Sequence, residues 1–468
     1  MVRNSTNSLN LISPIDGRYE KYTRDLAPYF SESASMKYKI LVEGEYLIAL
    51  SETSGVGVRK LSEKEKILIR NLSKNFGEED AKIISAIELR GYKNIQATNH
   101  DFKAIEYYIK EKLGGTSLKD VLEFVHFGLT SEDPGNIAYA LMISDSLEDV
   151  LLPAISKIVS ELDILAKKYK NLPMLARTHG QPASPTTFGK EFKVFANRLK
   201  QHSDILKNIR ISAKLNGATG NYNALYAAYP SVDWIKFSKK FIESFNKNRS
   251  QKLQVNLITT QIECHDSYVA IFDTLRRINT ILVNFNQDMW RYISDGWIEQ
   301  RPVAGEVGSS TMPHKINPWF LENSEGNLGM ANALFEFFGR KLPISRLQRD
   351  LSDSTVLRNI GTAFGHSLIG FQYLNNQLGR TVVNKEKALE DLNNHPEVIT
   401  EAIQTILRRE GVAMPYEKLK ALTRGKKISL PEIHKFIDTL EVSDKIKKEL
   451  KKITPENYIG LASKLASK

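Results

Sequence analysis

The feature that most restricts the fold of this chain is a set of long apolar stripes with helical spacing. In the stretch 268–297, apolar residues recur three or four positions apart: Ile271, Leu275, Ile278, Leu282, Phe285, Met289 and Ile293. Similar stripes cover residues 147–166, 192–209 and 356–378, and this period places side chains on one face of an α-helix. We therefore expect an all-α fold with a central bundle of long helices. Pro153 interrupts the second stripe and predicts a kink or a helix start.

Domain boundaries are indicated by changes in this pattern. The chain has 468 residues, enough for two or three domains. The pair Gly114–Gly115 separates a first helical region from the long stripes, and shorter elements rich in Lys and Glu follow Leu378. We predict an N-terminal helical domain (1–114), a central long-helix domain (115–365) and a small C-terminal helical domain (366–468).

Composition limits the possible partners. The net charge of +11 favours an anionic partner. The basic residues are spread along the chain and lack the clustering with aromatics that nucleic-acid binding needs, so we expect no nucleic acid. No apolar run reaches membrane-spanning length, and Met1–Asn10 lacks the apolar core of a signal peptide. Together with a single cysteine, Cys264, this predicts a cytoplasmic protein without membrane contact.

Four polar, glycine-containing segments lie between the helical stripes, at 97–101, 128–133, 177–186 and 305–318. Polar loops between rigid helices commonly carry function. The last segment combines glycines, prolines and adjacent serines with Lys315, which predicts a mobile loop suited to a carboxylate. Paired cysteines, a His-Glu-x-x-His motif and phosphate-binding glycine loops are absent from the sequence, so we expect neither a metal nor another cofactor.

The string Ser309-Ser-Thr-Met-Pro-His-Lys-Ile-Asn-Pro318 resembles the signature loop of the fumarase, aspartase and argininosuccinate lyase superfamily. This resemblance implies a three-domain fumarase/aspartase-like fold and a homotetramer around the long-helix bundle. It also implies active sites assembled from loops of three subunits. Members abstract a proton beside a carboxylate and expel a group from the neighbouring carbon, which releases fumarate.

Further segments resemble the adenylosuccinate lyase family of bacterial type. They are 13–19, 98–101, 130–133, 177–183, 346–350 and 354–358, and 415–420 extends the likeness toward the C-terminus. The family implies a carbon–nitrogen lyase of purine biosynthesis. Its substrates would be adenylosuccinate and succinylaminoimidazole carboxamide ribotide (SAICAR), and its products fumarate with AMP or with aminoimidazole carboxamide ribotide (AICAR). An insertion at 91–96 and the pair Pro134–Gly135 depart from the family pattern.

Elimination of fumarate needs an acid for the leaving nitrogen and a base for the C–H proton. His179 lies between Thr178 and Gly180, which indicates a turn, and histidine titrates near neutrality. We therefore predict His179 as the acid. The family implies Ser309 as the base, with Lys315 stabilising the carboxylate. Ser310 is the competing base.

The remaining candidates would bind substrate. His100 would support His179, with either Asp101 or Glu263 orienting the imidazoles. Hydroxyls and cations suit the phosphate and carboxylates. The candidates for the phosphate and sugar are Arg18, Tyr19, Arg349, Ser354 and Arg358. Those for the succinyl side are Thr130, Ser131, Gln261, Ser310, Lys315 and Asn317, and the family segments add Asn99, Asp101, Thr355, Val356 and Leu357.

Three other functions compete with this hypothesis. Argininosuccinate lyase or fumarase would share the 305–318 loop, but neither would be expected to share the 13–19 and 346–358 segments. A non-enzymatic protein on the same fold would not need His179, Ser309 and Lys315 together. A nucleic-acid-binding protein would need a recognisable motif.

Overall fold

The computed structural model describes residues 10–247, 249–302, 305, 311–312, 314–425 and 428–468. Over these residues the chain is mainly helical, and its strands are short and form two-stranded pairs. None of the described helices is long and apolar enough to cross a membrane. The expected all-α class is therefore confirmed.

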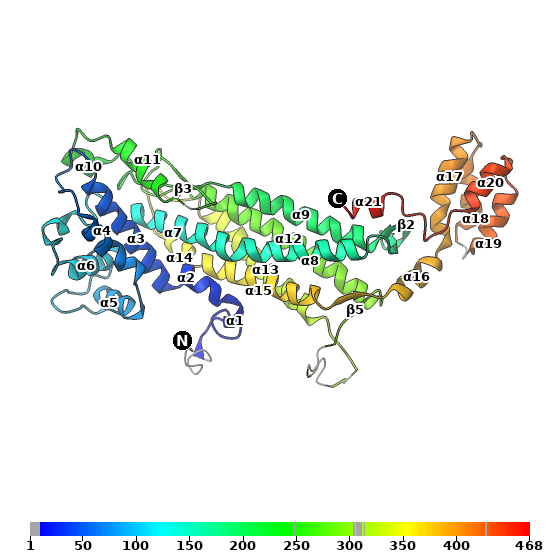
Figure 1. Cartoon of the computed structure of the whole chain (residues 1–468), viewed down its shortest axis with the longest axis horizontal. Helices are drawn as coiled ribbons and strands as arrows, with labels where there is room; N and C mark the ends of the chain where they lie inside the picture. Colours follow the sequence, from blue (N-terminus) through cyan, green and yellow to red (C-terminus); the bar gives the residue numbers. More distant parts are fainter. Residues whose placement is uncertain (1–9, 248, 303–304, 306–310, 313, 426–427) are drawn as a thin grey trace. The chain divides into compact units, whose positions relative to one another are not determined.

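The chain divides into two compact units, which we describe separately. Unit 1 comprises 1–154, 202–280 and 327–370, and unit 2 comprises 155–201, 281–326 and 371–468. Each of five long helices contains a point where the chain passes from one unit to the other. These helices, labelled in Figure 1, are α8 (Leu152–Lys168), α9 (Phe188–Asn208), α12 (Asp266–Ser294), α13 (Trp319–Lys341) and α15 (Ile360–Leu378). The division into three domains at residues 114 and 365 stays a prediction.

Unit 1 holds the N-terminal helices and the segments that later form the cavity. Its helices are α1 (Glu20–Thr23), η2 (Arg24–Leu26), α2 (Ala27–Phe30), α3 (Glu32–Ser51), α4 (Glu63–Lys74), α5 (Glu78–Leu89), α6 (Asp101–Leu113), η3 (Lys119–Phe124), α7 (Glu132–Ser146), the π-helical turn η4 (Leu147–Leu151), α10 (Asn223–Ala228), α11 (Trp234–Ser244) and α14 (Ser352–Leu357). Strands β3 (Ile211–Ala213) and β4 (Leu253–Val255) pair in parallel.

Unit 2 holds two antiparallel strand pairs and the C-terminal helices. The pairs are β1 (Pro173–Thr178) with β2 (Gln181–Thr187), and β5 (Ile298–Gln300) with β6 (Thr381–Val383). The helices are α16 (Lys385–Asn393), η5 (Pro396–Ile399), α17 (Thr400–Arg409), α18 (Pro415–Thr423), α19 (Leu430–Asp438), α20 (Asp444–Lys451) and α21 (Ala462–Leu465).

The long apolar stripes form the cores, as the helical period predicts. In α12 every residue of the predicted stripe is buried except Ile293. Within unit 1 the rings of Phe272 and Phe335 stack with centroids 5.6 Å apart, and Phe338 and Phe364 pack edge-on against them. Burying such rings contributes about 1.5–3 kcal/mol each. Within unit 1 this cluster packs α12, α13 and α15 against one another, and the cavity segment 349–358 lies between α13 and α15 in the sequence.

Two predictions about helix continuity have different outcomes. The kink or helix start expected at Pro153 corresponds to a change of helix type: the π-helical turn η4 ends at Leu151 and α8 begins at Leu152. Since proline has no N–H to donate, a wider turn before it leaves fewer unpaired carbonyls. The single helix expected over 356–378 is wrong. That stretch contains the end of α14 and all of α15, and Arg358 and Asn359 lie between them.

Candidate active site

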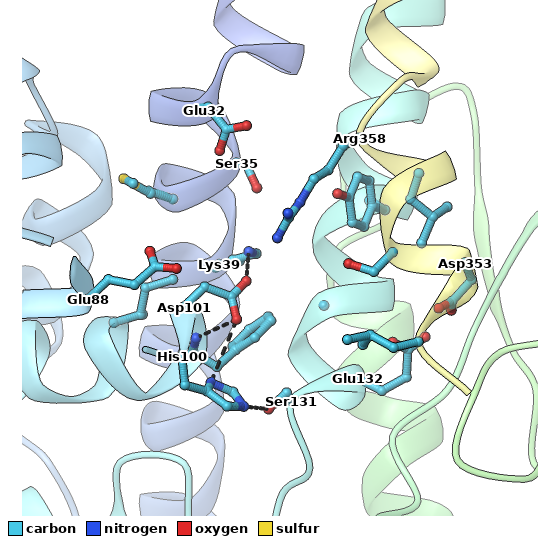
Figure 2. A pocket seen from close by; sticks show the side chains of 18 of the residues that line it. Glu32, Ser35, Lys39, Glu88, His100, Asp101, Ser131, Glu132, Asp353 and Arg358 are labelled. Atoms are coloured by element: carbon cyan, nitrogen blue, oxygen red, sulfur yellow. Dashed lines mark hydrogen bonds and ion pairs between the residues drawn. The ribbon is translucent and has the colours of Figure 1, made fainter. Parts of the chain in front are cut away.

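A cavity of about 610 Å³ lies in unit 1, where several predicted segments converge (Figure 2). Its walls come from α3, the start of α6, the start of α7 and the segment 349–358. Ten predicted site residues line it: Asn99, His100, Asp101, Thr130, Ser131, Gln261, Arg349, Ser354, Leu357 and Arg358. These residues span more than 250 positions of sequence, so the fold brings together what the motifs only suggested.

His100 occupies the N-terminus of α6 with a defined tautomer. Its Nδ1 accepts the backbone N–H of Lys103 at 3.3 Å, which caps the helix. A neutral ring must then carry its proton on Nε2, and that atom lies 3.5 Å from the Ser131 hydroxyl. Asn99, just before it, has φ of 48°, a left-handed conformation that asparagine tolerates. His100 therefore presents an N–H donor toward the opposite wall.

Asp101 is held by a buried lysine of α3. The Lys39 ammonium lies 2.6 Å from Asp101 Oδ2 and also over the Phe102 ring. Burial alone would raise the pKa of Asp101, but the Lys39 charge and hydrogen bond outweigh it, so the pKa is lowered. Asp101 Oδ1 is 3.7 Å from His100 Nδ1. Glu263, the alternative orienting group, instead accepts from Asn256 and from the His265 backbone.

Lys39→Met is expected to destabilise the protein by about 1–3 kcal/mol at pH 7, because it leaves the Asp101 carboxylate without its cation. Burial would then raise the pKa of Asp101, so the variant would take up a proton as the pH falls. The loss should shrink between pH 7 and pH 4, as measured by urea unfolding. Lys82→Met removes an exposed ion pair of α5 and should cost less than about 0.5 kcal/mol. An equal Lys39→Met loss at both pH values would contradict the role of the pair.

The loop before α7 is anchored by a fully buried ion pair. Asp133 lies 2.9 Å from Lys214 Nζ, and both side chains are inaccessible to solvent. The other Asp133 oxygen accepts the backbone N–H of Thr130 at 3.0 Å. Pro134 and Gly135, which depart from the family pattern, continue α7 as a regular helix. Thr130 and Ser131 are therefore fixed at the cavity wall.

Two arginines supply cations on the other wall. Arg349 donates to Gln261 Oε1 at 3.1 Å and lies 3.4 Å from Glu132 Oε2. Arg358 follows α14, and Figure 2 shows its side chain extending toward Ser35 and Lys39. Both can offer a planar fork to phosphate or carboxylate. The lining also contains five carboxylates, of which only Asp101 was a predicted site residue. They are Glu32, Glu88, Asp101, Glu132 and Asp353.

Sequence reasoning missed five charged residues of this cavity: Glu32, Lys39, Glu88, Glu132 and Asp353. A signal existed for Lys39, because it stands inside the apolar run of α3 and is buried there. A charged residue within such a run needs a partner. The partner lies 62 positions away in the sequence, so no local pattern could identify it.

His179 lies in unit 2 on a tight hairpin and is not among the residues that line the cavity of unit 1. The segment 177–186, expected to be a loop, is mostly β-hairpin. Thr178 pairs with Gln181, and both His179 and Gly180 have positive φ, 52° and 75°. Such two-residue turns match the twist of antiparallel strands. The turn predicted for His179 is confirmed, and its side chain is exposed.

The remaining predicted residues for which the structure gives a position are not part of this lining. Ser309 and Ser310 are outside the described residues. Lys315 is exposed and Asn317 half-buried in unit 2. In unit 1, Arg18 and Thr355 are exposed, Tyr19 is half-buried and Val356 is buried, and none of the four belongs to the lining.

Comparisons with known proteins agree with this architecture. The family described as Lyase matches residues 17–332, and the family described as Adenylosuccinate lyase C-terminal matches 345–459. A fumarate lyase from Mesorhizobium sp. BNC1 has the same fold, with a TM-score of 0.72, 17% identity and 96% of each chain covered. The 3-carboxy-cis,cis-muconate lactonizing enzyme of Pseudomonas putida gives a TM-score of 0.71 at 18% identity, covering 96% of this chain and 97% of that one. Fold and family match define a lyase of the fumarate lyase superfamily.

Relatives with higher identity narrow this class. Adenylosuccinate lyase of Haemophilus influenzae is 46% identical over 464 residues, 99% of both chains. Those of Dictyostelium discoideum and Escherichia coli are 48% and 43% identical, covering 97% of this chain and 97% and 98% of theirs. The chain belongs to the adenylosuccinate lyase family.

Proposed function

We propose that this protein eliminates fumarate from adenylosuccinate to give AMP, and from SAICAR to give AICAR. The observation that carries the proposal is end-to-end similarity to relatives named adenylosuccinate lyase, combined with a cavity that gathers ten predicted residues. Both substrates carry a phosphate and two succinyl carboxylates. Arg349, Arg358, Thr130 and Ser131 supply the forks and hydroxyls that such groups need.

The chemistry assigns separate roles to two groups. His179 donates a proton to the leaving nitrogen, and Ser309 takes the proton from the carbon beside the carboxylate. Lys315 stabilises the negative charge that grows on that carboxylate in the transition state. His100 donates from Nε2 toward the bound substrate, because its Nδ1 is already occupied by the helix cap. The protein's own side chains thus supply every proton transfer.

Ultraviolet absorbance tests the function directly. Adenylosuccinate and AMP absorb differently, so mixing the protein with adenylosuccinate should give a time-dependent spectral change and one fumarate per AMP. Argininosuccinate and malate serve as controls for the sister activities of the superfamily. Turnover of either control in place of adenylosuccinate would contradict the proposal, and no turnover of any substrate would favour a non-enzymatic protein.

We further propose that the active protein is a cytoplasmic homotetramer whose sites are shared between subunits. The cavity lining of one chain contains more carboxylates than cations, which does not suit an anionic substrate. The cation Lys315 and the acid His179 are not among its lining residues, and both belong to unit 2. Large apolar side chains are also exposed on four long helices: Ile164, Val194, Ile205, Trp290, Met330 and Phe337. Purine nucleotides and a single cysteine fit the reducing cytoplasm.

Light scattering should therefore give four times the chain mass of 53.0 kDa. The reason is that the exposed apolar stripes need a covering partner. Replacing Met330 and Phe337 with Lys should lower the mass and the activity together. Lys replacing the exposed Leu465, in the C-terminal α21, is the control. A monomer with full activity would exclude shared sites.

A further inference from the structure

Three titratable side chains to which no role has been assigned, Glu132, His265 and Asp353, meet at the wall of the cavity, and Glu132 and Asp353 belong to its lining. Glu132 is the first residue of α7, His265 directly precedes α12, and Asp353 lies in the first turn of α14. Each contributes one atom to a group in which all atoms lie within 4.8 Å of one another. Their exposures are 7%, 1% and 2%. Figure 2 shows Glu132 and Asp353 together on the side of the cavity opposite Glu88.

Four polar atoms of this cluster lack a hydrogen-bond partner among the described residues, inside the cluster as well as outside it. They are Glu132 Oε1, His265 Nδ1 and both Asp353 oxygens. The His265 ring donates instead to the backbone carbonyl of Leu342, so a neutral ring presents Nδ1 as an acceptor. Three buried acceptors that face one another would repel, and one proton among them removes that repulsion.

Neighbouring charges indicate where that proton lies. Arg349 is 3.4 Å from Glu132 Oε2, on the side away from the unpaired Oε1. Lys214 is already paired with Asp133, and Asp266 adds a further negative charge beside His265. Burial raises the pKa of Glu132 to about 8 against the opposing effect of Arg349. Burial also lowers the pKa of His265 to about 4, so at neutral pH the proton belongs on Glu132.

Each member of the cluster is joined to a segment of the cavity wall. Ser131, which faces His100, directly precedes Glu132. Ser354 directly follows Asp353, and both line the cavity. His265 fixes the start of α12 in a left-handed conformation, with φ of 61°. The distance between the succinyl-side and nucleotide-side segments therefore depends on this contact.

We propose that Glu132, His265 and Asp353 share one proton and act as positioning residues that hold the Ser131 and Ser354 segments at the spacing the substrate needs. Identifying the substrate as a succinyl-purine nucleotide rests on the proposed function; the protonated cluster itself does not. His265 is a positioning residue because its ring does not line the cavity. Loss of the proton places two carboxylates against each other and separates the segments.

Kinetics of His265→Asn test the positioning role. Asparagine accepts the left-handed backbone but cannot reach the carboxylates as the imidazole does. We expect KM for adenylosuccinate to rise about tenfold while kcat falls less than threefold, because binding geometry and not chemistry is changed. The matched control is His366→Asn, which alters another buried histidine of unit 1, bonded to Asn327 at 2.9 Å. The control should keep the wild-type KM, and an unchanged KM in His265→Asn would overturn the proposal.

A pH series with Glu132→Gln tests the shared proton. The glutamine amide donates a hydrogen bond at every pH and so mimics the protonated acid. Wild-type KM should rise several-fold from pH 7 to pH 9, whereas that of Glu132→Gln should stay flat. The pKa of the Glu132 carboxyl is raised in the folded protein. Its contribution to stability is therefore fully present below the pKa of the unfolded carboxyl, and it is lost as the pH rises through the folded value of about 8. The midpoint of thermal unfolding should therefore fall with pH in the wild type, and less in the variant.

The unfolding series needs no substrate, so it separates the cluster from the proposed function. If the protein had another activity, KM for adenylosuccinate could not be measured. The difference in thermal unfolding between wild type and Glu132→Gln would still be observed. Identical pH profiles of unfolding in both proteins would overturn the shared proton. So would a stoichiometric divalent metal found by mass spectrometry in the purified protein and absent from Asp353→Asn, since a cation would then take the proton's place.

Discussion

Replacing His179 by glutamine should lower kcat by about 10²–10⁴-fold and change KM little, because a general acid acts in the transition state and not in binding. The hairpin turn makes this variant informative. His179 is exposed and adopts φ of 52°, a conformation that costs a non-glycine residue about 1–2 kcal/mol. Asparagine tolerates it better, so His179→Asn checks that the loss is chemical.

The control for this experiment is a histidine to which no role in catalysis or binding is assigned. His434→Gln, in α19, should retain wild-type kcat. Thermal unfolding of all three variants checks that the fold persists. A His179→Gln enzyme with kcat within threefold of wild type would assign the acid to another group. His100, which already presents an N–H into the cavity, would then be the first alternative.

Ser309→Ala belongs to the same experiment, because it removes the proposed base. We expect a loss of similar size, about 10²–10⁴-fold in kcat. Ser310→Ala should affect turnover less. If Ser310→Ala is inactive while Ser309→Ala keeps near-normal turnover, the base assignment is wrong. The loop hypothesis for 305–318 adds that bound AMP and fumarate should slow hydrogen exchange there relative to the free enzyme.

Mixing two inactive variants should restore activity if sites are shared between subunits. A His179→Gln chain keeps an intact cavity, and a His100→Gln chain keeps an intact His179. After dissociation and reassembly of an equal mixture, about one quarter of the sites in a symmetric assembly would combine both intact parts. The expected result is recovery to about a quarter of wild-type turnover from two proteins that each show almost none.

Two outcomes would contradict this prediction. If each site were built within one chain, every chain in the mixture would still carry a lesion, and no activity would return. Recovery without exchange of subunits, checked by mixing under conditions that preserve the assembly, would point to contamination. The matched control mixes His179→Gln with Ser131→Ala, because both Ser131 and His100 belong to the unit 1 cavity and should behave alike.

The long helices could be predicted from sequence because their signal is local and repeated. The stripe in 268–297 corresponds to α12, and the stripe residues from Phe192 to Leu206 lie within α9. The stripe in 356–378 wrongly predicted one continuous helix, because the apolar spacing continues through Arg358 and Asn359, where the chain leaves the helix. Period alone cannot detect such a break. The turn at His179 was predicted, but the strands of the hairpin at 173–187 were missed, because the polar segment 177–186 shows no apolar alternation that would indicate strands.

The sequence by itself determined the helical class, the likeness to a family and the identity of ten cavity residues, because these depend on period and on ordered motifs. Tertiary structure decided which side chains carry charge into the cavity and which neutralise it. Lys39 meets Asp101 across 62 positions, and Glu132 meets His265 and Asp353 across more than a hundred. Buried charges are stable only with such partners, and partners so distant in the chain are chosen by helix packing, which leaves no local trace.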